Sequence, residues 1–405
     1  MIYNQTKKNK NWNTMKLNEL GTFSRGKSKH RPRNDKKLFE GGGYPLVQTG
    51  EIKEANLYVK KHNAEYNEFG LSQSKLWNKG TLCITIAANI AETAILAYPM
   101  CFPDSIVGFN ANKKVCSELF MHYIFTYIKQ AIQMSASGSI QDNINIDYLE
   151  HLDFKIPSKS IQDKITKVLC NIDKKIELNN EIIDKLERLC KTIYNYWFVQ
   201  YEFPNCNGKP YKSFGGRMVW NNELKKEIPE NWKISTIGKI IIEKEKSMIQ
   251  VGEAKNQHGK YPFFTSGNEI YETNEFLTDG RNCYLSTGGK AKVQYYIGKS
   301  SYSTDTWVIT AKDNLEDYLY LFIKSIENIL DKKYFAGTGL KHLQKEWLKD
   351  TKIVIPNDGV LKKFNILSKP MFNKISQSYK ENKVLLKLRD FLLPLLMNGQ
   401  VGFKD

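Results

Sequence analysis

One ordered series of short motifs occurs twice in this chain, and this repetition constrains the fold more than any other feature. The motifs at residues 15–21, 44–50, 80–83 and 137–157 recur in the same order at residues 232–238, 261–267, 280–283 and 336–356. The last pair aligns without a gap, and both of its members end in Ile-Pro. Chance matches of Gly and Pro can mimic one such segment, but hardly four in order. The sequence therefore predicts two divergent copies of one module.

Both copies predict the same mixture of strands and helix. Short apolar runs bounded by Gly and Asn predict strands, at Leu46–Thr49, Thr81–Ile86 and Ile95–Tyr98 in the first copy and at Tyr261–Thr265, Asn282–Ser286, Val293–Ile297 and Trp307–Thr310 in the second. A helical segment follows in each copy, at Ser117–Met134 and Leu315–Leu330, and then a Gly-containing loop and a last strand. The expected fold class is α+β, with two similar mixed α/β domains in tandem.

A long helix is predicted after each Ile-Pro. In the first helix the apolar residues alternate at spacings of four and three, which is typical of a coiled-coil seam; the seam positions are Ile165, Leu169, Ile172, Ile176, Asn179, Ile183, Leu186, Cys190, Ile193 and Trp197. Asn179 is the kind of polar seam residue that fixes register at a cost in stability. The second helix has a less regular seam, interrupted by Pro370 and Pro394, with Ile375, Leu385, Leu388 and Leu392 as pairing candidates. Because one chain carries both helices, we expect them to pair with each other; the alternative is that each packs on its own domain.

These patterns divide the chain into five segments. We expect a first domain at residues 1–157, a central long helix at 158–200 and a connector at 201–231. A second domain at 232–356 and a C-terminal long helix at 357–405 complete the chain. The connector is identified by its Pro, Gly and Asn content, and it leads into the second copy through Glu227-Ile228-Pro229-Glu230-Asn231-Trp232.

The charge of the chain indicates a polyanionic partner. Its 405 residues include 60 Lys and Arg against 43 Asp and Glu, a net charge of +17. This balance favours nucleic acid, and the alternative is a basic composition driven by codon usage. No apolar stretch reaches the ~18 residues of a membrane span, and the N-terminal residues lack the apolar core of a signal peptide. The seven cysteines are scattered without zinc-type spacing, which indicates reduced thiols and a cytoplasmic location.

Two motifs look catalytic but lack the surroundings that such motifs need. Residues 21–28 fit the G-x-x-x-x-G-K-S pattern of a phosphate-binding loop, yet Pro32 follows closely and no apolar helical face comes after it. Residues 335–339 resemble the F-x-G-x-G element of adenosylmethionine-dependent methyltransferases, but they follow a helical segment rather than a strand. We therefore expect no catalytic, cofactor or metal site in this chain. The enzyme alternative is a stand-alone P-loop or adenosylmethionine-dependent DNA-modifying protein.

Polar loop residues are the remaining candidates, and they suit DNA. The dense basic stretch at residues 25–37 can contact phosphates, whereas Gln, Asn, Ser and Thr in Gly-containing loops can reach base edges. The candidate DNA-binding residues are Arg25, Lys27, Lys29, His30, Arg31, Arg33, Gln48, Thr49, Gln73, Ser74, Ser137, Ser139, Ser266, Asn268, Thr287, Lys290, Lys292, Thr338, Lys341 and His342. Two DNA-binding modules joined by stiff long helices predict recognition of two DNA sites at a fixed separation.

The order of these pieces resembles one protein family. Two variable globules, each followed by a long helix, are similar to the specificity subunits of Type I restriction–modification systems. The segments that carry the resemblance are Tyr44–Ile52, Lys79–Ala87, Cys101–Ser105, Ile172–Asn180 and Tyr196–Val199, together with the entry to the second copy at residues 227–232. The resemblance covers about residues 15 to 400.

The resemblance implies both a fold and a function. Each globule would be a target recognition domain for one half of a split DNA sequence, and the two helices would pair antiparallel as a ruler that docks two methyltransferase subunits. Restriction subunits, if present, would join through those. The chain itself would be non-catalytic, with adenosylmethionine, ATP and Mg on partner subunits. The alternative to DNA recognition is a coiled-coil scaffold that binds only protein.

Overall fold

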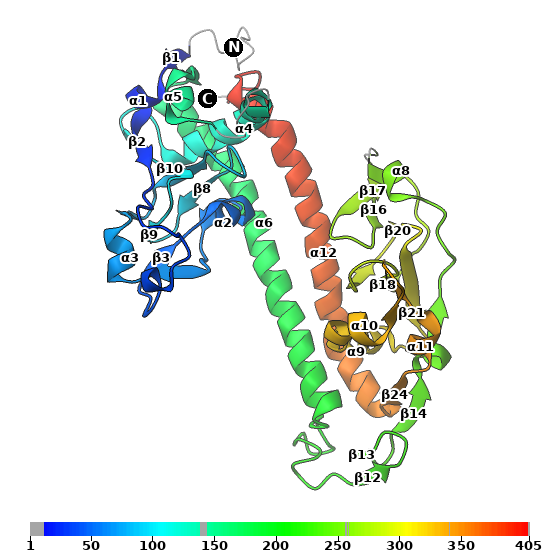
Figure 1. Cartoon of the computed structure of the whole chain (residues 1–405). Helices are drawn as coiled ribbons and strands as arrows, with labels where there is room; N and C mark the ends of the chain where they lie inside the picture. Colours follow the sequence, from blue (N-terminus) through cyan, green and yellow to red (C-terminus); the bar gives the residue numbers. More distant parts are fainter. Residues whose placement is uncertain (1–11, 138–143, 256, 258, 340, 404–405) are drawn as a thin grey trace. The chain divides into compact units, whose positions relative to one another are not determined.

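The computed structural model of the chain describes residues 12–137, 144–255, 257, 259–339 and 341–403. The chain forms two compact units: unit 1 comprises residues 1–178 and 381–405, and unit 2 comprises residues 179–380. The long helices α6 (Lys159–Tyr194) and α12 (Asp358–Met397) each contribute one part to unit 1 and the other part to unit 2 (Figure 1). Unit 1 is therefore built from two segments that are distant in the sequence.

Unit 1 is organised around a five-stranded sheet with the order β2-β10-β7-β8-β4. These strands are β2 (Gly21–Arg25), β10 (Ile106–Ala111), β7 (Leu82–Thr85), β8 (Thr93–Leu96) and β4 (Tyr58–Val59). Neighbouring strands are antiparallel except β4, which is parallel to β8. A second sheet has the order β5-β3-β9-β6, formed by β5 (Ala64–Tyr66), β3 (Tyr44–Leu46), β9 (Met100–Cys101) and β6 (Leu76–Trp77).

The central strand β7 is buried along its length because both of its faces are covered. Leu82 and Ile84 join the hydrophobic cluster that includes Phe120 of α4 (Glu118–Ser137), whereas Cys83 packs in a separate cluster with Met100 of the second sheet. The other elements of unit 1 are β1 (Asn13–Met15), α1 (Leu17–Leu20), a 3-10 turn (Lys36–Leu38), α2 (Thr49–Glu54), α3 (Glu68–Ser72), α5 (Ile146–His151) and β11 (Phe154–Ile156).

Unit 2 is organised around a four-stranded antiparallel sheet with the order β15-β21-β18-β19. These strands are β15 (Ile241–Glu243), β21 (Thr306–Ala311), β18 (Arg281–Ser286) and β19 (Val293–Ile297). A three-stranded sheet contains β17 (Ile270–Thr273), β16 (Tyr261–Phe264) and β20 (Ser301–Tyr302). The remaining elements are β14 (Lys233–Thr236), α7 (Ile237–Ile240), α8 (Val251–Lys255), α9 (Glu316–Ser325), α10 (Glu327–Lys333), β22 (Phe335–Ala336), β23 (His342–Leu343), α11 (Lys345–Lys349) and β24 (Lys352–Ile355). The connector forms the hairpin of β12 (Met218–Asn221) and β13 (Lys226–Pro229).

The strand orders confirm that the fold is duplicated. β2, β10, β7 and β8 of unit 1 correspond in order and direction to β15, β21, β18 and β19 of unit 2. The short helix before the first of these strands recurs as α1 and α7, and the pair of β1 with β11 recurs as β14 with β24. The predicted α+β class and tandem arrangement of two similar domains are thus correct.

One sequence match between the copies is wrong by a residue. The sequence comparison pairs Cys83 with Cys283, but Cys83 lies opposite Gly108 whereas Cys283 lies opposite Ile309. Cys283 packs in the main core of unit 2 and Cys83 on the other face of its sheet. Because side chains alternate between faces of a strand, a shift of one residue reverses the face, and the structure makes Tyr284 the equivalent of Cys83.

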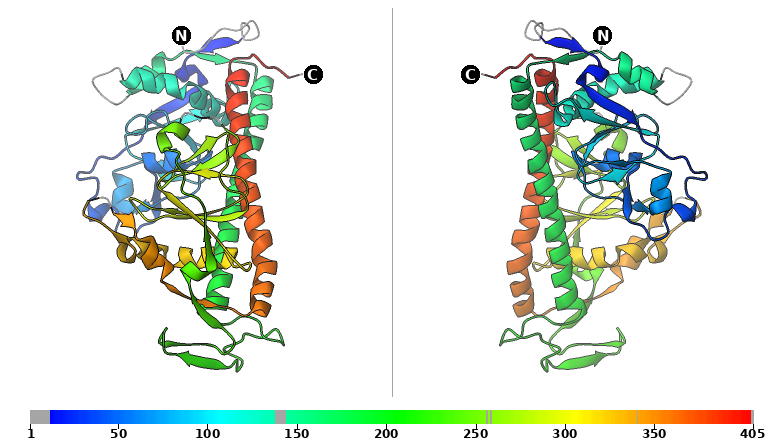
Figure 2. Two further views of the ribbon diagram at one scale, coloured as in Figure 1. Left: turned by 90° about the vertical axis from the view of Figure 1, so that its right-hand side faces the viewer. Right: turned by 90° about the vertical axis from the view of Figure 1, so that its left-hand side faces the viewer.

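The two long helices pair antiparallel in both units. In unit 1, Asp173 of α6 contacts Arg389 of α12, and Lys175 contacts Glu381 at 3.3 Å. In unit 2 the Cys190 sulfur lies 3.9 Å from the Met371 sulfur. In the π-helical turn that continues α6 (Asn195–Val199), the Trp197 ring packs on Phe364. Positions rise along α6 while their partners fall along α12, which is antiparallel pairing. Figure 2 shows the start of α6 beside the end of α12.

The expected interruption of the second helix at Pro370 and Pro394 is not observed, since α12 runs through both residues. A proline inside a helix leaves the carbonyl four residues earlier without its backbone donor. For Pro370 that carbonyl belongs to Ile366, a residue that is 65% exposed on the helix surface. Within the described residues, no helix is both long enough and apolar enough to cross a membrane.

Candidate nucleic-acid interface

Four strand ends define one edge of the main sheet in unit 1. The pairing of Arg25 with Val107 and of Thr85 with Ile106 places the end of β2, the start of β10 and the end of β7 next to one another. The start of β8 at Thr93 completes this edge, because β8 pairs antiparallel with β7. We call this edge, with the loops at residues 25–35, 86–92 and 102–105, edge 1.

The basic segment at residues 25–35 is held on edge 1 by backbone contacts. Gly26 donates to the Ile106 carbonyl at 2.8 Å, and a Cβ at this position would lie 2.3 Å from the Phe102 carbonyl oxygen, so only glycine fits. Lys29 N donates to the Gln73 carbonyl at 3.1 Å, and Ser74 Oγ donates to the Lys27 carbonyl at 2.9 Å. The structure therefore brings Gln73 and Ser74 together with the basic residues, as both groups were predicted candidates.

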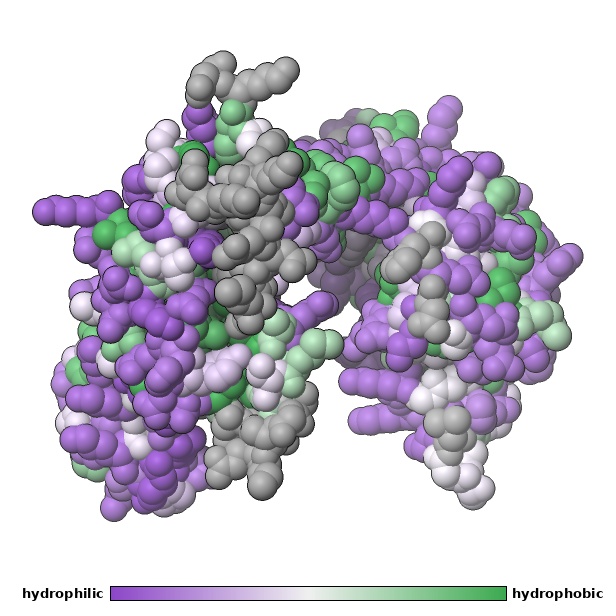
Figure 3. All heavy atoms as spheres, turned by 90° about the horizontal axis from the view of Figure 1, so that it is seen from above, coloured by the Kyte–Doolittle hydropathy of each residue, from purple (hydrophilic) through white to green (hydrophobic). Residues whose placement is uncertain are grey.

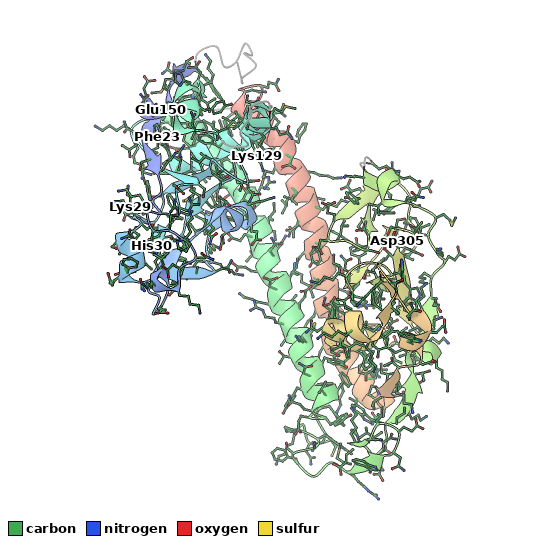
Figure 4. All side chains as sticks on the ribbon, viewed as in Figure 1. Phe23, Lys29, His30, Lys129, Glu150 and Asp305 are labelled. Atoms are coloured by element: carbon green, nitrogen blue, oxygen red, sulfur yellow. The ribbon has the colours of Figure 1, made fainter. Side chains whose placement is uncertain are left out.

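The positive charges of this segment differ in how strongly they are neutralised. Arg33 lies 2.6 Å and Arg31 3.8 Å from the Asp104 carboxylate. His30 contacts Asp35 at 2.8 Å, and this hydrogen bond lowers the pKa of the Asp35 carboxyl. Within the described part of the chain, Arg25, Lys27 and Lys29 form no ion pair, and all three are exposed. Lys29 and His30 are labelled in Figure 4.

The segment that fits a phosphate-binding loop in sequence does not have that loop's structure. Residues 21–25 form β2, and Gly26 packs against the backbone of Phe102. The next described helical turn, Lys36–Leu38, has only 3 residues. A phosphate-binding loop needs a helix N-terminus directly after its glycines, and this segment offers none.

Gln48 and Thr49 lie at the start of α2, beside edge 1. Gln48 N donates to Glu51 Oε2 at 3.1 Å, as expected for a helix N-cap, and the Gln48 side chain is exposed. Farther along α2, Lys53 Nζ donates to Asn89 Oδ1 at 3.2 Å in the turn between β7 and β8. These two candidates are therefore linked to edge 1 through α2.

Unit 2 has an equivalent edge, which we call edge 2, formed by the loops at residues 266–268, 286–292, 304–305, 337–339 and 341–343. Ser266 Oγ donates to the Asp305 carbonyl, Thr287 N donates to the same carbonyl at 2.9 Å, and Lys292 Nζ donates to the Gly267 carbonyl at 2.9 Å. Asp305 is labelled in Figure 4. The structure thus gathers residues from loops that are far apart in the sequence.

The hairpin of β22 and β23 closes edge 2. Gly289 N donates to the Lys341 carbonyl at 3.3 Å, and Leu343 N donates to the Thr287 carbonyl at 2.9 Å. Thr338, Lys341 and His342 are exposed on this hairpin. Burial, aided by the charge of Lys324, lowers the pKa of the half-buried Lys292. All predicted candidates of the second copy thus lie on the loops of edge 2. They are Ser266, Asn268, Thr287, Lys290, Lys292, Thr338, Lys341 and His342.

Two candidates of the first copy are not placed on edge 1. Ser137 is the last residue of α4, and Ser139 lies outside the described residues. Ile144, the next described residue after Ser137, does reach the edge, because its N donates to the Ile86 carbonyl at 3.0 Å. This bond is the counterpart of the one from Leu343 to Thr287 in unit 2.

Sequence reasoning missed the turn at residues 86–92. It lies between β7 and β8, at the position of the turn that carries Lys290 in unit 2. A signal was available, since a hydroxyl residue ends the preceding strand in both copies, Thr85 in β7 and Ser286 in β18. The one-residue error at Cys83 kept these two hydroxyl residues out of register.

Most of the predicted seam residues are buried between the helices and the sheets. Ile165, Leu169, Ile172, Ile176, Asn179, Ile183 and Ile375 are buried, and Leu186, Ile193, Leu385 and Leu392 are partly buried. Leu388 is 42% exposed and does not join the seam, whereas Leu393, five residues later, is buried. The surface in view in Figure 3 is largely hydrophilic, with hydrophobic side chains in small groups.

No cluster of three or more His, Cys, Asp or Glu that could hold a metal ion is found among the described residues. The comparisons with known proteins give matches to one protein family. A family model described as "Type I restriction modification DNA specificity domain" matches residues 9–188 and 229–368. The first matched range includes edge 1, and the second includes edge 2.

Individual relatives match over nearly the whole chain. The chain is 24% identical to the Type I restriction enzyme MjaIX specificity subunit of Methanocaldococcus jannaschii, over 98% of this chain and 95% of that protein. It is 22% identical to the Type I restriction enzyme HindI specificity subunit of Haemophilus influenzae, over 91% of this chain and 97% of that protein. Among solved structures, the S subunit of a Type I restriction-modification system from M. genitalium shares the fold, with a TM-score of 0.63 and 16% identity over 98% of this chain and 96% of that chain.

Proposed function

Because the chain belongs to the Type I restriction–modification DNA specificity family, whose model matches most of its length, we propose that it is the subunit that reads a split DNA sequence, one half with each unit. The family match confirms the resemblance identified in the sequence. The observation that carries the proposal is the pair of equivalent sheet edges, each lined by exposed basic and amide side chains.

The chemistry of the two edges suits duplex DNA. Exposed Lys and Arg side chains on loops, such as Lys27 and Lys29 on edge 1 and Lys290 and Lys341 on edge 2, supply the phosphate contacts that dominate affinity. Neighbouring amide and hydroxyl groups supply donors and acceptors for base edges. A net charge of +17 over the whole chain adds long-range attraction.

The paired helices are the proposed docking surface for two methyltransferase subunits. In unit 1 the C-terminal part of α12 exposes Val384, Leu388 and Phe391, at 66%, 42% and 65%. Their spacing of four and three places them on one face of the helix, and an exposed apolar face of this kind is typical of a protein contact. Restriction subunits, in systems that have them, would join through the methyltransferase subunits.

The chain itself is proposed to be non-catalytic, with adenosylmethionine, ATP and Mg bound by its partner subunits. Two features support this assignment. The first five residues of the G-x-x-x-x-G-K-S segment form strand β2, and the F-x-G-x-G segment lies in the hairpin of β22 and β23 instead of between a strand and a helix. We also propose a cytoplasmic location, in keeping with seven free cysteines of which six are buried.

Methylome sequencing of a host that carries this system tests the proposal. We expect a methylated motif split into two halves, and we expect that exchange of residues 12–156 for those of a relative changes only one half. A contiguous motif, or a change in both halves after the exchange, contradicts it. The scaffold alternative predicts no mobility shift with random duplex DNA, with or without methyltransferase subunits. The enzyme alternative predicts binding of ATP or adenosylmethionine by the purified chain in calorimetry.

A further inference from the structure

We propose that Asn89 and Lys290, each at the tip of an equivalent turn, read one base in each half of the target, and that Thr85 and Ser286 position these turns. This inference rests on the proposed function and deepens it, because it names one specificity-determining position in each unit. It is carried by hydrogen bonds that recur in both units between residues that share no identity.

In unit 1 a single buried hydroxyl closes the turn between β7 and β8. Thr85 is 0% exposed; its Oγ1 accepts from Glu92 N at 2.9 Å and donates to the Asn89 carbonyl oxygen. The hydroxyl therefore bonds both the tip and the end of the turn with one donor and one acceptor. We call this arrangement the hydroxyl latch.

In unit 2 a serine forms the same latch. Ser286 is 4% exposed; its Oγ accepts from Lys292 N at 2.9 Å and donates to the Lys290 carbonyl oxygen at 2.9 Å. The carbonyl that accepts belongs in both units to the fourth residue after the hydroxyl, which makes Asn89 and Lys290 equivalent. Two latches of the same design at the same strand ends indicate that the conformation of the tip matters.

Each turn is also supported from the helix behind it. Gln133 Nε2 of α4 donates to the Ile90 carbonyl at 2.9 Å, and in unit 2 Asp331 Oδ1 of α10 accepts from Ala291 N at 2.6 Å. Lys129 of α4, labelled in Figure 4, pairs with Glu92 at 2.7 Å. The tips are thus fixed before any ligand arrives, which lowers the ordering cost of binding.

The backbone of the first turn adopts a conformation that L-residues rarely take. Ala88 and Ala91, on either side of the tip, both have φ of 60°. Unit 2 uses Gly289, with φ of 76°, next to its tip. Alanine in the left-handed region costs free energy that the surrounding contacts must offset, and such strain clusters at functional sites.

The two tips carry side chains that discriminate between bases. An Asn amide can pair with the N6 and N7 atoms of adenine, whereas a Lys ammonium donates to the O6 and N7 atoms of guanine. Asn89 is half-exposed, and its Oδ1 accepts from Lys53 Nζ at 3.2 Å, so the second lone pair of Oδ1 and the Nδ2 donor face the base. Lys290 is exposed and forms no ion pair within the described residues. We therefore assign an adenine to the unit 1 tip and a guanine to the unit 2 tip.

Exchange of the two tip residues tests the assignment. The full chain, produced with its methyltransferase subunits, carries either N89K or K290N, and the methylated motif is determined by methylome sequencing. We expect N89K to change one adenine to guanine in one half only and K290N to change one guanine to adenine in the other half only, each with at least about a tenfold change in preference. The matched controls are N78K and K312N, exposed positions at the opposite ends of β7 and β21.

The possible outcomes separate the inference from the proposed function. A split motif in the wild type that is unaltered by N89K and K290N overturns the inference and leaves the function intact, whereas a wild type without a split motif overturns both. If a folded variant methylates no site, selection of bound duplexes from a random pool decides: relaxed preference at one position of one half supports the inference, and unchanged preference overturns it.

The latch has its own test. T85V and S286A remove the hydroxyl, whereas T85S and S286T retain it. We expect T85V to relax base preference at the position read by Asn89, at least about fivefold, while T85S restores it, and we expect the same relation between S286A and S286T in the other half. A general loss of binding without change in base preference, or a defect shared by T85S, would show that the hydroxyl only stabilises the fold.

Discussion

Arg389 of α12 donates a hydrogen bond to Asp173 of α6 at 3.1 Å, and the Asp173 side chain is 2% exposed. Tyr123 of α4 donates to the other carboxylate oxygen of Asp173 at 2.7 Å. In unit 1, the buried carboxylate of Asp173 on α6 is thus hydrogen-bonded to both α4 and α12.

Loss of the Arg389 guanidinium should destabilise unit 1. R389M leaves the carboxylate of Asp173 buried without its cation, which costs about 3 kcal/mol or more. The double variant R389M/D173L removes both charges and should recover much of this loss. Urea unfolding measures both. The control K167M changes an exposed residue of α6 and should have little effect. Equal stability of R389M and wild type would contradict the role of this ion pair.

Acid should weaken unit 1 through His122. Burial, with a contribution from the charge of Arg389, lowers the pKa of His122 from 6.5 to about 4. The unfolded chain therefore binds a proton below pH 6.5 that the folded chain does not bind, so stability falls as the pH decreases from 6.5 to about 4. The slope reaches at most about 1.4 kcal/mol per pH unit from this group.

H122N should flatten this pH dependence, since Asn can keep a hydrogen bond to Thr93 but does not titrate. The measurement is the free energy of unfolding between pH 7 and pH 4. H151N, at an exposed histidine, serves as the control and should leave the slope as it is in the wild type. An unchanged slope in H122N would refute the assignment.

The basic segment should carry part of the salt dependence of DNA binding. K27A and K29A each remove an exposed cation, so affinity should fall and the slope of log K against log salt should become shallower by about 0.9 for each phosphate that is no longer neutralised. R31A and R33A should also weaken binding, but their guanidinium groups are partly neutralised by Asp104. Fluorescence anisotropy across a salt series measures both quantities. K79A, at the opposite end of β7, is the control. If the slope of log K against log salt is unaltered in K27A, K29A, R31A and R33A, the basic segment does not belong to the DNA interface.

The seam of the long helix should be sensitive to charge. Ile176 is 5% exposed and Ile183 3%, so I176D or I183D buries a carboxylate and should unfold the helix pair or abolish assembly with methyltransferase subunits. L178D, on the same helix at a residue that is 51% exposed, should keep the fold. Circular dichroism and size-exclusion chromatography distinguish these results. A normal complex with I176D would argue against the seam.

The duplication and the pairing of the long helices could be predicted because they depend on patterns that persist over many residues. Four motifs in order revealed two modules, and a regular spacing from Ile165 to Trp197 revealed the seam. The antiparallel direction came from the family resemblance, and the contacts of Asp173 with Arg389 and of Trp197 with Phe364 bear it out.

Single residues were harder to predict because their roles depend on contacts across the fold. A shift of one residue in a strand changes no local pattern, so Cys83 was matched to Cys283 although the two face opposite sides. From the sequence alone, Pro370 predicts a break in the helix. In the structure α12 continues through Pro370, and Ile366, four residues earlier, lies exposed on the helix surface. The turn around Asn89 has an ordinary sequence, and only the hydroxyl of Thr85 and the amide of Gln133 show that it is fixed.

The division of α12 between the two units has a consequence for biosynthesis. Residues 179–380, which make up unit 2, leave the ribosome before residues 381–405, which unit 1 requires. Unit 1, whose first segment is translated first, is therefore completed only after unit 2 has been translated. Until the end of α12 emerges, the cluster that contains Ile165 and Leu169 lacks Leu393, Leu396 and Met397, and Asp173 lacks Arg389. The nascent chain must keep this part of α6 from aggregating.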